Sequence, residues 1–278
     1  MEIVRQATRS LGYVEDQNIA IQWRFAEGKN ERYPDIATEL IQLRVNVIVP
    51  FGDLAIRAVQ KATTTIPIVA MTDDLVGAGL VASLARPCGN TTGVSILASE
   101  LNVKRLELLK ESVPKVSHVA AFWDPGSGTF HLKGMEVAAK SLAVQLKILE
   151  VRSPDDLARQ FEAARKWHAE ALNILASPLL FAYRKTFIDL AARSRLPAIY
   201  QWREGAEDGG LMSYAPTLRD MYQRVTVFVD KILKGTKPAD LPVEQPTKFE
   251  FIINLKVAKQ IGVTIPPNVL ARADKVIK

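Results

Sequence analysis

Short apolar runs alternate with amphipathic segments along the first half of the chain. The apolar, β-branched runs that predict strands fall at residues 19–25, 45–50, 66–71 and 92–96. The segments with helical periodicity fall at residues 31–43, 54–62, 75–85 and 99–113. Strands that alternate with helices in this way are typical of a parallel sheet covered by helices on both faces.

The second half repeats this alternation. Predicted strands lie at residues 118–123, 145–151, 171–176, 198–200 and 210–213, and predicted helices at residues 129–142, 154–167 and 179–194. The helix after Ser153 has a clear start signal, because Ser153 caps it, Pro154 occupies its first position and Asp156 follows three residues after the cap. The repeated pattern predicts an α/β protein of two doubly wound, Rossmann-like lobes joined by a hinge.

The last forty or so residues add structure after the second half is complete. A helix predicted over residues 218–233 ends at Gly235 and Pro238, and an apolar run follows at 249–255. We expect this tail to return to the first half. The expected lobes are then residues 1–114 with 236–278, and residues 115–235.

The chain opens with a helical pattern over residues 2–11, and no strand pattern precedes it. The first strand of a doubly wound lobe usually lies in the middle of its sheet. We therefore expect the first strand of lobe 1 to be missing from this sequence. Another segment or a second copy would then fill the gap, which makes a homodimer through the incomplete lobe one expectation.

Composition narrows the range of functions. The net charge of +6 comes from scattered Lys and Arg with no run of five, so the sequence gives little support to a nucleic-acid partner. The single cysteine, Cys88, excludes an intrachain disulfide. No apolar run reaches the 18 or so residues that span a bilayer, and no export signal opens the chain. We expect a soluble protein that is cytosolic or already separated from its signal.

The sequence lacks the common catalytic motifs. The stretch 77–82, GAGLVA, fits a dinucleotide pattern, but residues 72–76 separate it from the strand that such a site requires. Nucleophile elbow, phosphate loop and zinc-protease motifs are absent. His118, His131 and His168 are expected to lie far apart. We predict no enzyme, no cofactor and no metal site.

Ligands of open α/β sheets bind outside the carboxyl ends of the strands. In the first half these ends carry Phe51, Gly52, Asp53, Thr72, Asp73 and Ser95, and in the second half Trp123, Asp124, Ser177, Gln201, Trp202 and Tyr214. Aromatic residues are only 7% of the chain, yet five lie at or beside such ends: Phe51, Trp123, Tyr200, Trp202 and Tyr214. This placement favours stacking on a flat ligand.

Most of these residues also have a structural interpretation. Trp123 and Tyr214 are explained equally well as caps of the core. Asp73 precedes a predicted helix, where an acid is more often a cap than a cation ligand. The turns at 52–53 and 126–129 either hold a ligand carboxylate with backbone N–H groups or cap their own helices. Asp124 is either an acceptor for an amino group or a turn former.

Several segments resemble a known family. They are LGYVE at 11–15 with Asn18-Ile19, GLVASLARP at 79–87, GNTTG at 89–93, GGLMSY at 209–214, ADLPVEQPTKFE at 239–250 and INLK at 253–256. They resemble the substrate-binding components of ABC transporters, and more narrowly the group associated with tryptophan and tyrosine uptake. The likeness covers essentially the whole chain. Two differences are the missing export signal with the first strand, and Cys88, where the family usually has glycine.

The resemblance implies a type I periplasmic-binding-protein fold with three crossovers and a ligand cleft between the lobes. It also implies a periplasmic receptor without cofactor that captures a small solute, closes by hinge motion and delivers it to an ABC permease and its ATPase. An aromatic or apolar amino acid, or a related carboxylate, is the implied solute. The alternative is the ligand-sensing module of a transcriptional or signalling regulator. An enzyme of the doubly wound class comes third.

Overall fold

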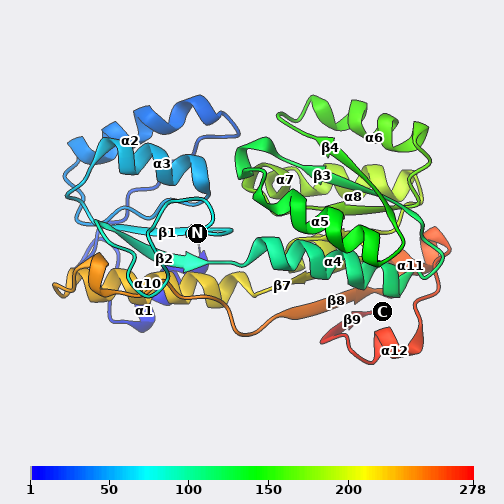
Figure 1. The fold of residues 1–278 in the computed structure, drawn as a ribbon. Coiled ribbons are helices and arrows are strands. Elements are labelled where there is room, and N and C mark those ends of the chain that lie inside the picture. Colours follow the sequence, from blue (N-terminus) through cyan, green and yellow to red (C-terminus); the bar gives the residue numbers. More distant parts are fainter. Residues whose placement is uncertain (1) are drawn as a thin grey trace. The chain divides into compact units, whose positions relative to one another are not determined.

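The computed structural model describes residues 2–278, without the side chains of Phe130, His131 and Lys133. The chain divides into two compact units, each built from two stretches of sequence (Figure 1). Unit 1 comprises Met1–Leu97 and Leu218–Thr247, and unit 2 comprises Ala98–Thr217 and Lys248–Lys278. Both units are α/β, as the alternating pattern predicts. The chain passes between them at 97/98, 217/218 and 247/248, which gives the three crossovers that the resemblance implies.

Unit 1 is built around a small parallel sheet. Its elements are α1 (Glu2–Ser10), η1 (Asn30–Arg32), α2 (Tyr33–Gln42), α3 (Asp53–Ala62), β1 (Ile68–Thr72), β2 (Thr91–Ser95), α10 (Leu218–Leu233) and η3 (Pro238–Asp240). β1 and β2 pair in parallel, with Ile68 opposite Thr91. Single bridges join Ile48 and Phe51 to β1, and Glu244 to β2. The result is a row of four parallel extended segments, of which only the inner two form a continuous ladder.

Close packing inside this sheet depends on one glycine. Gly93 of β2 has φ +148 and lies directly against Ala70 of β1, so that a Cβ at position 93 would fall 1.8 Å from the Ala70 carbonyl oxygen. Helix α10 packs on both strands and on α1. Its Asp230 accepts a hydrogen bond of 2.8 Å from the Tyr13 hydroxyl.

Two expected elements of unit 1 are wrong. The strand predicted at 19–25 is an irregular segment: its single bridge joins Ile19 to Glu15, and residues 20–25 pair with no described strand. Trp23 and Phe25 stack there at 6.4 Å, and Phe25 is 55% exposed. The helix predicted at 75–85 is a series of turns. Gly77 and Gly79 disfavour a helix, and the Asp74 side chain caps the N–H of Gly77 at 2.9 Å.

Unit 2 contains a seven-stranded sheet. Its helices are α4 (Ala98–Ser112), η2 (Pro125–Ser127), α5 (Phe130–Ser141), α6 (Asp156–Lys166), α7 (Pro178–Ala182), α8 (Arg184–Arg193), α9 (Arg203–Glu207), α11 (Leu255–Ile261) and α12 (Pro267–Leu270). Its strands are β3 (His118–Trp123), β4 (Gln145–Glu150), β5 (Ala171–Ile174), β6 (Ala198–Tyr200), β7 (Met212–Ala215), β8 (Glu250–Asn254) and β9 (Lys275–Ile277). The strand order is β4-β3-β5-β6-β7-β8-β9. Strands β3 to β7 are parallel, and β8 runs antiparallel to β7.

Each face of this sheet packs against its own hydrophobic core. Successive side chains of a strand point to opposite faces, so neighbouring residues of β3 enter different cores. Ala121 of β3 faces a core that includes Leu106 of α4 and Met135 of α5. The neighbouring Phe122 faces the opposite core, where it lies 4.9 Å from the ring of Phe161 and 5.1 Å from that of Phe187. Within residues 2–278, no helix combines the length and apolar character that crossing a membrane requires.

The observed division corrects the expected lobe boundaries of 1–114 with 236–278 and 115–235. The tail returns to the second half, because β8 pairs with β7 and places Phe251 opposite Tyr214. Helix α10 belongs to unit 1, because its apolar stripe packs on α1, β1 and β2. Helix α4 belongs to unit 2, where Leu106 and Leu109 are fully buried in the core. The amphipathic pattern predicted these elements but not the sheet that each one covers.

Candidate functional site

The carboxyl ends of the unit 1 strands gather the first set of predicted residues. Phe51 ends the outer extended segment, Thr72 ends β1, and Ser95 ends β2. Gly52 follows with φ +83, a conformation that glycine adopts without strain, and turns the chain into α3. Its N–H donates to the Met71 carbonyl at 3.0 Å. The turn thus serves its own sheet and helix.

Three of these side chains are buried and bonded within unit 1. The Thr72 hydroxyl donates to the carboxylate of Asp53, and burial raises the pKa of Asp53 above its usual range. The Ser95 hydroxyl accepts the N–H of Leu75 at 3.2 Å. Asp73, directly after β1, is half-buried. Asp53, Thr72 and Ser95 therefore shape this edge rather than offer free groups.

Phe51 lies at the same edge, half-buried, with its ring edge-on to Tyr222 of α10 at 5.5 Å and 73°. The sequence interpretation missed Tyr222, because it treated α10 only as a helix with one apolar stripe. Tyr222 follows directly after the stripe residue Met221, and this position was the available signal. The pair gives unit 1 an aromatic surface beside its strand ends.

Unit 2 brings three predicted residues into one hydrogen-bond network. They follow the adjacent strands β3, β5 and β6. The Ser177 hydroxyl donates to Asp124 Oδ2 at 2.6 Å, and the N–H of Gly126 donates to Asp124 Oδ1 at 2.8 Å. The Gln201 side-chain oxygen accepts the Ser177 N–H at 2.7 Å, and the Gln201 side-chain nitrogen donates to the Ser177 carbonyl at 3.0 Å. The two bonds close a ring between the Gln201 amide and the Ser177 backbone. All three side chains are buried.

This network confirms the turn-forming interpretation of Asp124, while its contact with a solute amino group stays a prediction. Both of its carboxylate oxygens accept hydrogen bonds inside unit 2, so its turn-forming role is observed directly. Burial raises the pKa of Asp124, and the bond from Ser177 opposes that rise. Ser177 also caps α7, since its hydroxyl accepts the N–H of Leu180 at 3.2 Å. The network therefore joins the ends of β3, β5 and β6 through hydrogen bonds.

The aromatic residues of unit 2 differ in exposure. Trp123 is 9% exposed, belongs to the core and donates to the Gly128 carbonyl at 2.9 Å, so it caps the core and shapes the turn. Tyr214 is half-buried and stacks on Phe249 at 5.8 Å and 22°. Trp202 is half-buried and meets the Phe181 ring edge-on at 6.5 Å.

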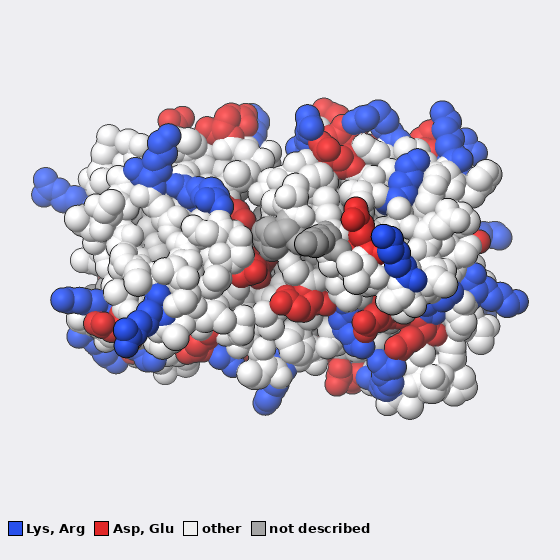
Figure 2. All heavy atoms as spheres, in the orientation of Figure 1, with Lys and Arg blue, Asp and Glu red and all other residues white. Residues whose placement is uncertain are grey.

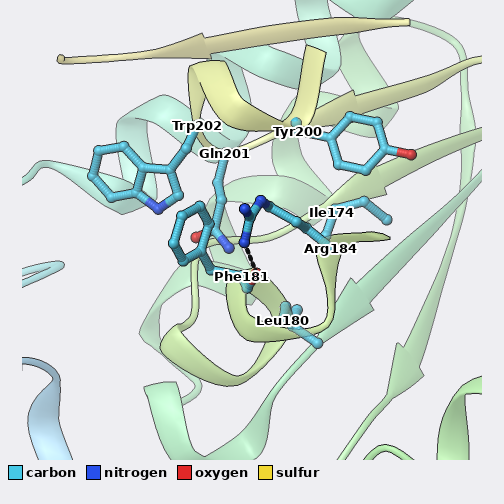
Figure 3. A pocket seen from close by; sticks show the side chains of 8 residues that line it. Ile174, Leu180, Phe181, Arg184, Tyr200, Gln201 and Trp202 are labelled. Carbon is cyan, nitrogen blue, oxygen red and sulfur yellow. Dashed lines mark hydrogen bonds between the residues drawn. The ribbon is translucent and has the colours of Figure 1, made fainter. Parts of the chain in front are cut away.

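A small, open hollow adjoins Trp202 (Figure 3). Its lining residues are Ile174, Leu180, Phe181, Arg184, Tyr200, Gln201, Trp202 and Gly205. The Arg184 guanidinium lies over the Phe181 ring at 4.6 Å and donates to the Phe181 carbonyl and to Asp208, at 3.3 and 2.8 Å. The sequence interpretation missed Phe181 and Arg184, which it placed inside a continuous helix at 179–194. The break between α7 and α8 brings them to the strand ends.

The described residues offer little other chemistry. None of their His, Cys, Asp and Glu side chains form a group of three or more that would hold a metal ion. The expected wide separation of the histidines is wrong for one pair, because His118 meets the ring of Trp167, the residue before His168, at 5.1 Å. The His131 side chain lies outside the described residues. Cys88 is exposed and has φ +65, a conformation that glycine favours, at the position where the resembled family usually has glycine.

Charged side chains of both signs are interspersed on the face seen in Figure 2. Some charged residues of the chain form ion pairs with a partner three or four positions away, such as Arg165 with Glu162 at 2.7 Å and Lys234 with Asp230 at 2.8 Å. Exposed pairs of this kind contribute little to stability, typically below about 1 kcal/mol. The basic excess is therefore distributed, as the scattered Lys and Arg of the sequence predict.

Two α/β units, linked by three chain crossings and bearing aromatic residues at their strand ends, define the class of two-lobed solute-binding proteins. Residues 2–277 match the family described as ABC transporter substrate binding protein, so the chain belongs to that family. The family comprises solute-binding proteins and not enzymes.

The chain is also similar to individual proteins. It is 23% identical to a tyrosine-binding protein of Clostridioides difficile over 261 residues, which are 92% of this chain and 74% of that protein. A conserved domain protein from Vibrio cholerae has a TM-score of 0.92 at 25% identity, and an ABC domain from Streptococcus pneumonia in complex with L-Trp has one of 0.88 at 24%. Each alignment covers 99% of this chain and 94% of the other. These similarities confirm the predicted two-lobed fold.

Proposed function

We propose that this chain is the substrate-binding component of an ABC-type importer and captures an aromatic amino acid or a related carboxylate. The observation that carries the proposal is the presence of a partly exposed aromatic pair at the strand ends of each unit. These pairs are Phe51 with Tyr222, and Trp202 with Phe181. Aromatic side chains recognise a flat ring by stacking and edge contacts, and their polar neighbours orient it.

The proposed site residues fall into two groups by exposure. We propose direct solute contacts for the half-buried Phe51, Asp73, Trp202 and Tyr214, and for backbone N–H groups near Gly52. Asp53, Thr72, Ser95, Trp123, Asp124, Ser177 and Gln201 are buried and hydrogen-bonded, and they hold the strand ends in place. We propose that the second group keeps the strand ends in position and, apart from the predicted contact of Asp124 with a solute amino group, does not itself contact the solute.

The proposed mechanism is a population shift. The chain crosses between the units three times, so a change in the crossing segments moves one unit as a body against the other. A solute that both units contact favours the closed form over the open form by the sum of those contacts. The closed form would then be the one that a permease and its ATPase recognise outside the cytoplasm, in the periplasm of a cell with two membranes.

The solute class is supported by the relatives. The C. difficile protein is described as tyrosine-binding, and the S. pneumonia structure contains L-Trp. A homodimer through lobe 1 stays a prediction, which sedimentation velocity of the purified chain would test. A regulator's sensing module stays the alternative.

The function is tested by isothermal titration and thermal denaturation with L-Trp, L-Tyr, L-Phe, L-Leu, benzoate and D-glucose. Ligand at about 100 times its Kd adds about 2.7 kcal/mol to the free energy of unfolding, which shifts Tm by several degrees for a chain of this size. We expect saturable binding of at least one aromatic probe and none of glucose. Binding of glucose alone, or of no probe, would overturn the proposed solute class.

A further inference from the structure

Arg105 is a buried cation in the core of unit 2. It lies on α4, is 1% exposed and is among the largest fully buried side chains of the chain. Its Nε donates to the Tyr214 carbonyl at 2.8 Å, and one terminal nitrogen donates to Asn102 Oδ1 at 2.6 Å. The other reaches toward the Gln201 carbonyl at 3.5 Å. One planar group thus contacts the carboxyl ends of both β6 and β7.

Asn102, one turn earlier on α4, extends this contact to β5. Its Oδ1 accepts the N–H of Ala176 at 3.3 Å as well as the bond from Arg105. Its backbone carbonyl accepts the Asn173 side-chain amide at 3.2 Å. The two side chains therefore tie α4 to three adjacent strands at the edge where the proposed site residues lie.

The geometry favours a positioning role over simple packing. A guanidinium stays charged at any physiological pH, and burying it is costly unless several acceptors surround it. An apolar side chain of similar size would fill the space without that cost, but it would leave the Tyr214 and Gln201 carbonyls without this donor. Two of the acceptors are main-chain carbonyls of Tyr214 and Gln201, which are candidate-site residues, so the position of Arg105 bears on the position of that edge.

We propose that Arg105, with Asn102, is a positioning pair that fixes the ends of β5, β6 and β7 for solute binding. The pair acts through Ser177, Gln201, Trp202 and Tyr214 without contacting the solute. The ligand-binding part of this inference rests on the proposed function, whereas the positioning part does not.

The test uses the full chain labelled with 5-fluorotryptophan and compares R105M, R105K and N102A with the wild type. Trp202 reports on the site edge, and Trp167 reports on the opposite edge, since it packs against His118 at the start of β3. The matched control is N254A. Asn254 is a buried polar residue that donates to the Ala206 carbonyl at 3.1 Å, at the end of antiparallel β8 and so away from the carboxyl ends of β5 to β7.

We expect R105M and N102A to move the fluorine signal of Trp202 in the ligand-free protein while that of Trp167 stays in place. We also expect the Kd for the best aromatic probe to rise about tenfold, with R105K intermediate, because Lys keeps the charge but its single nitrogen lacks the planar fork that reaches the Tyr214 and Gln201 carbonyls together. N254A is expected to lower Tm and leave both readouts unchanged.

The inference is overturned if the Trp202 signal of R105M matches that of the wild type, or if N254A moves it as far. If R105M does not fold, R105K and N102A give the same decision. If the wild type binds no probe, the proposed function fails, and the ligand-free signal of Trp202 still decides whether Arg105 positions the edge.

Discussion

The two units reach the same architecture with very different completeness. Unit 2 has seven paired strands, helices on both faces and a polar network that joins three strand ends. Unit 1 has one ladder of two strands, which single bridges extend on either side. Beside it lies an irregular stretch at residues 20–29, with Phe25 more than half exposed.

The two units thus stabilise their strand-end edges, where we propose that the solute binds, in different ways. In unit 2 the side chains of Asp124, Ser177 and Gln201 are held by hydrogen bonds within the unit, which favours a fixed edge. In unit 1 the edge depends on a few close contacts in a small sheet, and local opening costs less where fewer interactions must break. We therefore expect substitutions in unit 1 to act locally and those in unit 2 to act on the whole sheet.

The largest effect is expected from G93A in unit 1. The new Cβ would lie 1.8 Å from the Ala70 carbonyl oxygen, so β1 and β2 must separate. We expect the free energy of unfolding to fall by about 3 kcal/mol. Amide hydrogen exchange should become faster in unit 1 before it does so in unit 2. The control is G79A, where φ is also positive but nothing lies within 4 Å of the added Cβ. Equal losses in the two variants would show that backbone conformation, and not the close approach, is responsible.

The next effect is expected from S177A in unit 2. It removes the bond to Asp124 and the cap on Leu180, and it leaves a buried carboxylate oxygen without that donor. We expect a loss of about 2 kcal/mol in urea denaturation, with increased exchange at the ends of both β3 and β6. The control is S141A, which loses only one local hydrogen bond to the Ala138 carbonyl. Its free energy of unfolding should stay within about 0.5 kcal/mol of the wild-type value. Exchange changes confined to α7 would contradict a shared network.

A smaller effect concerns pH. Burial raises the folded-state pKa of Asp124, so the folded protein binds a proton more tightly there than the unfolded chain. Stability from this group is therefore present below the unfolded pKa of about 3.9 and is lost as pH rises through the folded pKa. D124N should remove that descending part of the curve and keep the bond from Gly126. Urea denaturation between pH 4 and 7 measures it, and parallel curves for the two proteins would refute the assignment.

The smallest effect is expected from F25S. Phe25 is 55% exposed and its main described ring contact is Trp23, so its removal should change stability by less than about 0.5 kcal/mol. A loss above about 1 kcal/mol in thermal denaturation would mean that residues 20–29 are more firmly packed than their exposure indicates.

The sequence predicted the strand–helix alternation and the carboxyl-end residues because periodicity and turn signals are local. It placed Asp124, Ser177 and Gln201 at the carboxyl ends of strands, and the structure makes these strands neighbours and joins the residues in one network. It did not predict that the tail joins unit 2, because the choice of β7 as partner of β8 depends on which sheet has an edge to offer.

The site residues that were missed share one cause. Arg105, Tyr222, Phe181 and Arg184 lie on helices, and only the packing of each helix decides whether its side chains reach the strand ends. The turn series at 75–85 was missed for a related reason. Its apolar residues have helical spacing, but the Asp74 cap and two glycines favour local turns, which a periodicity argument does not weigh.

The most direct test of the proposed aromatic site is isothermal titration of L-Trp and L-Tyr into the wild type, W202A and F25A. Trp202 is half-buried beside the hollow of unit 2, whereas Phe25 is an exposed aromatic residue of unit 1 with no assigned role. We predict saturable binding to the wild type, a Kd raised about tenfold or more in W202A, and no change in F25A. Equal affinity of W202A and the wild type for the probe that binds would contradict the account.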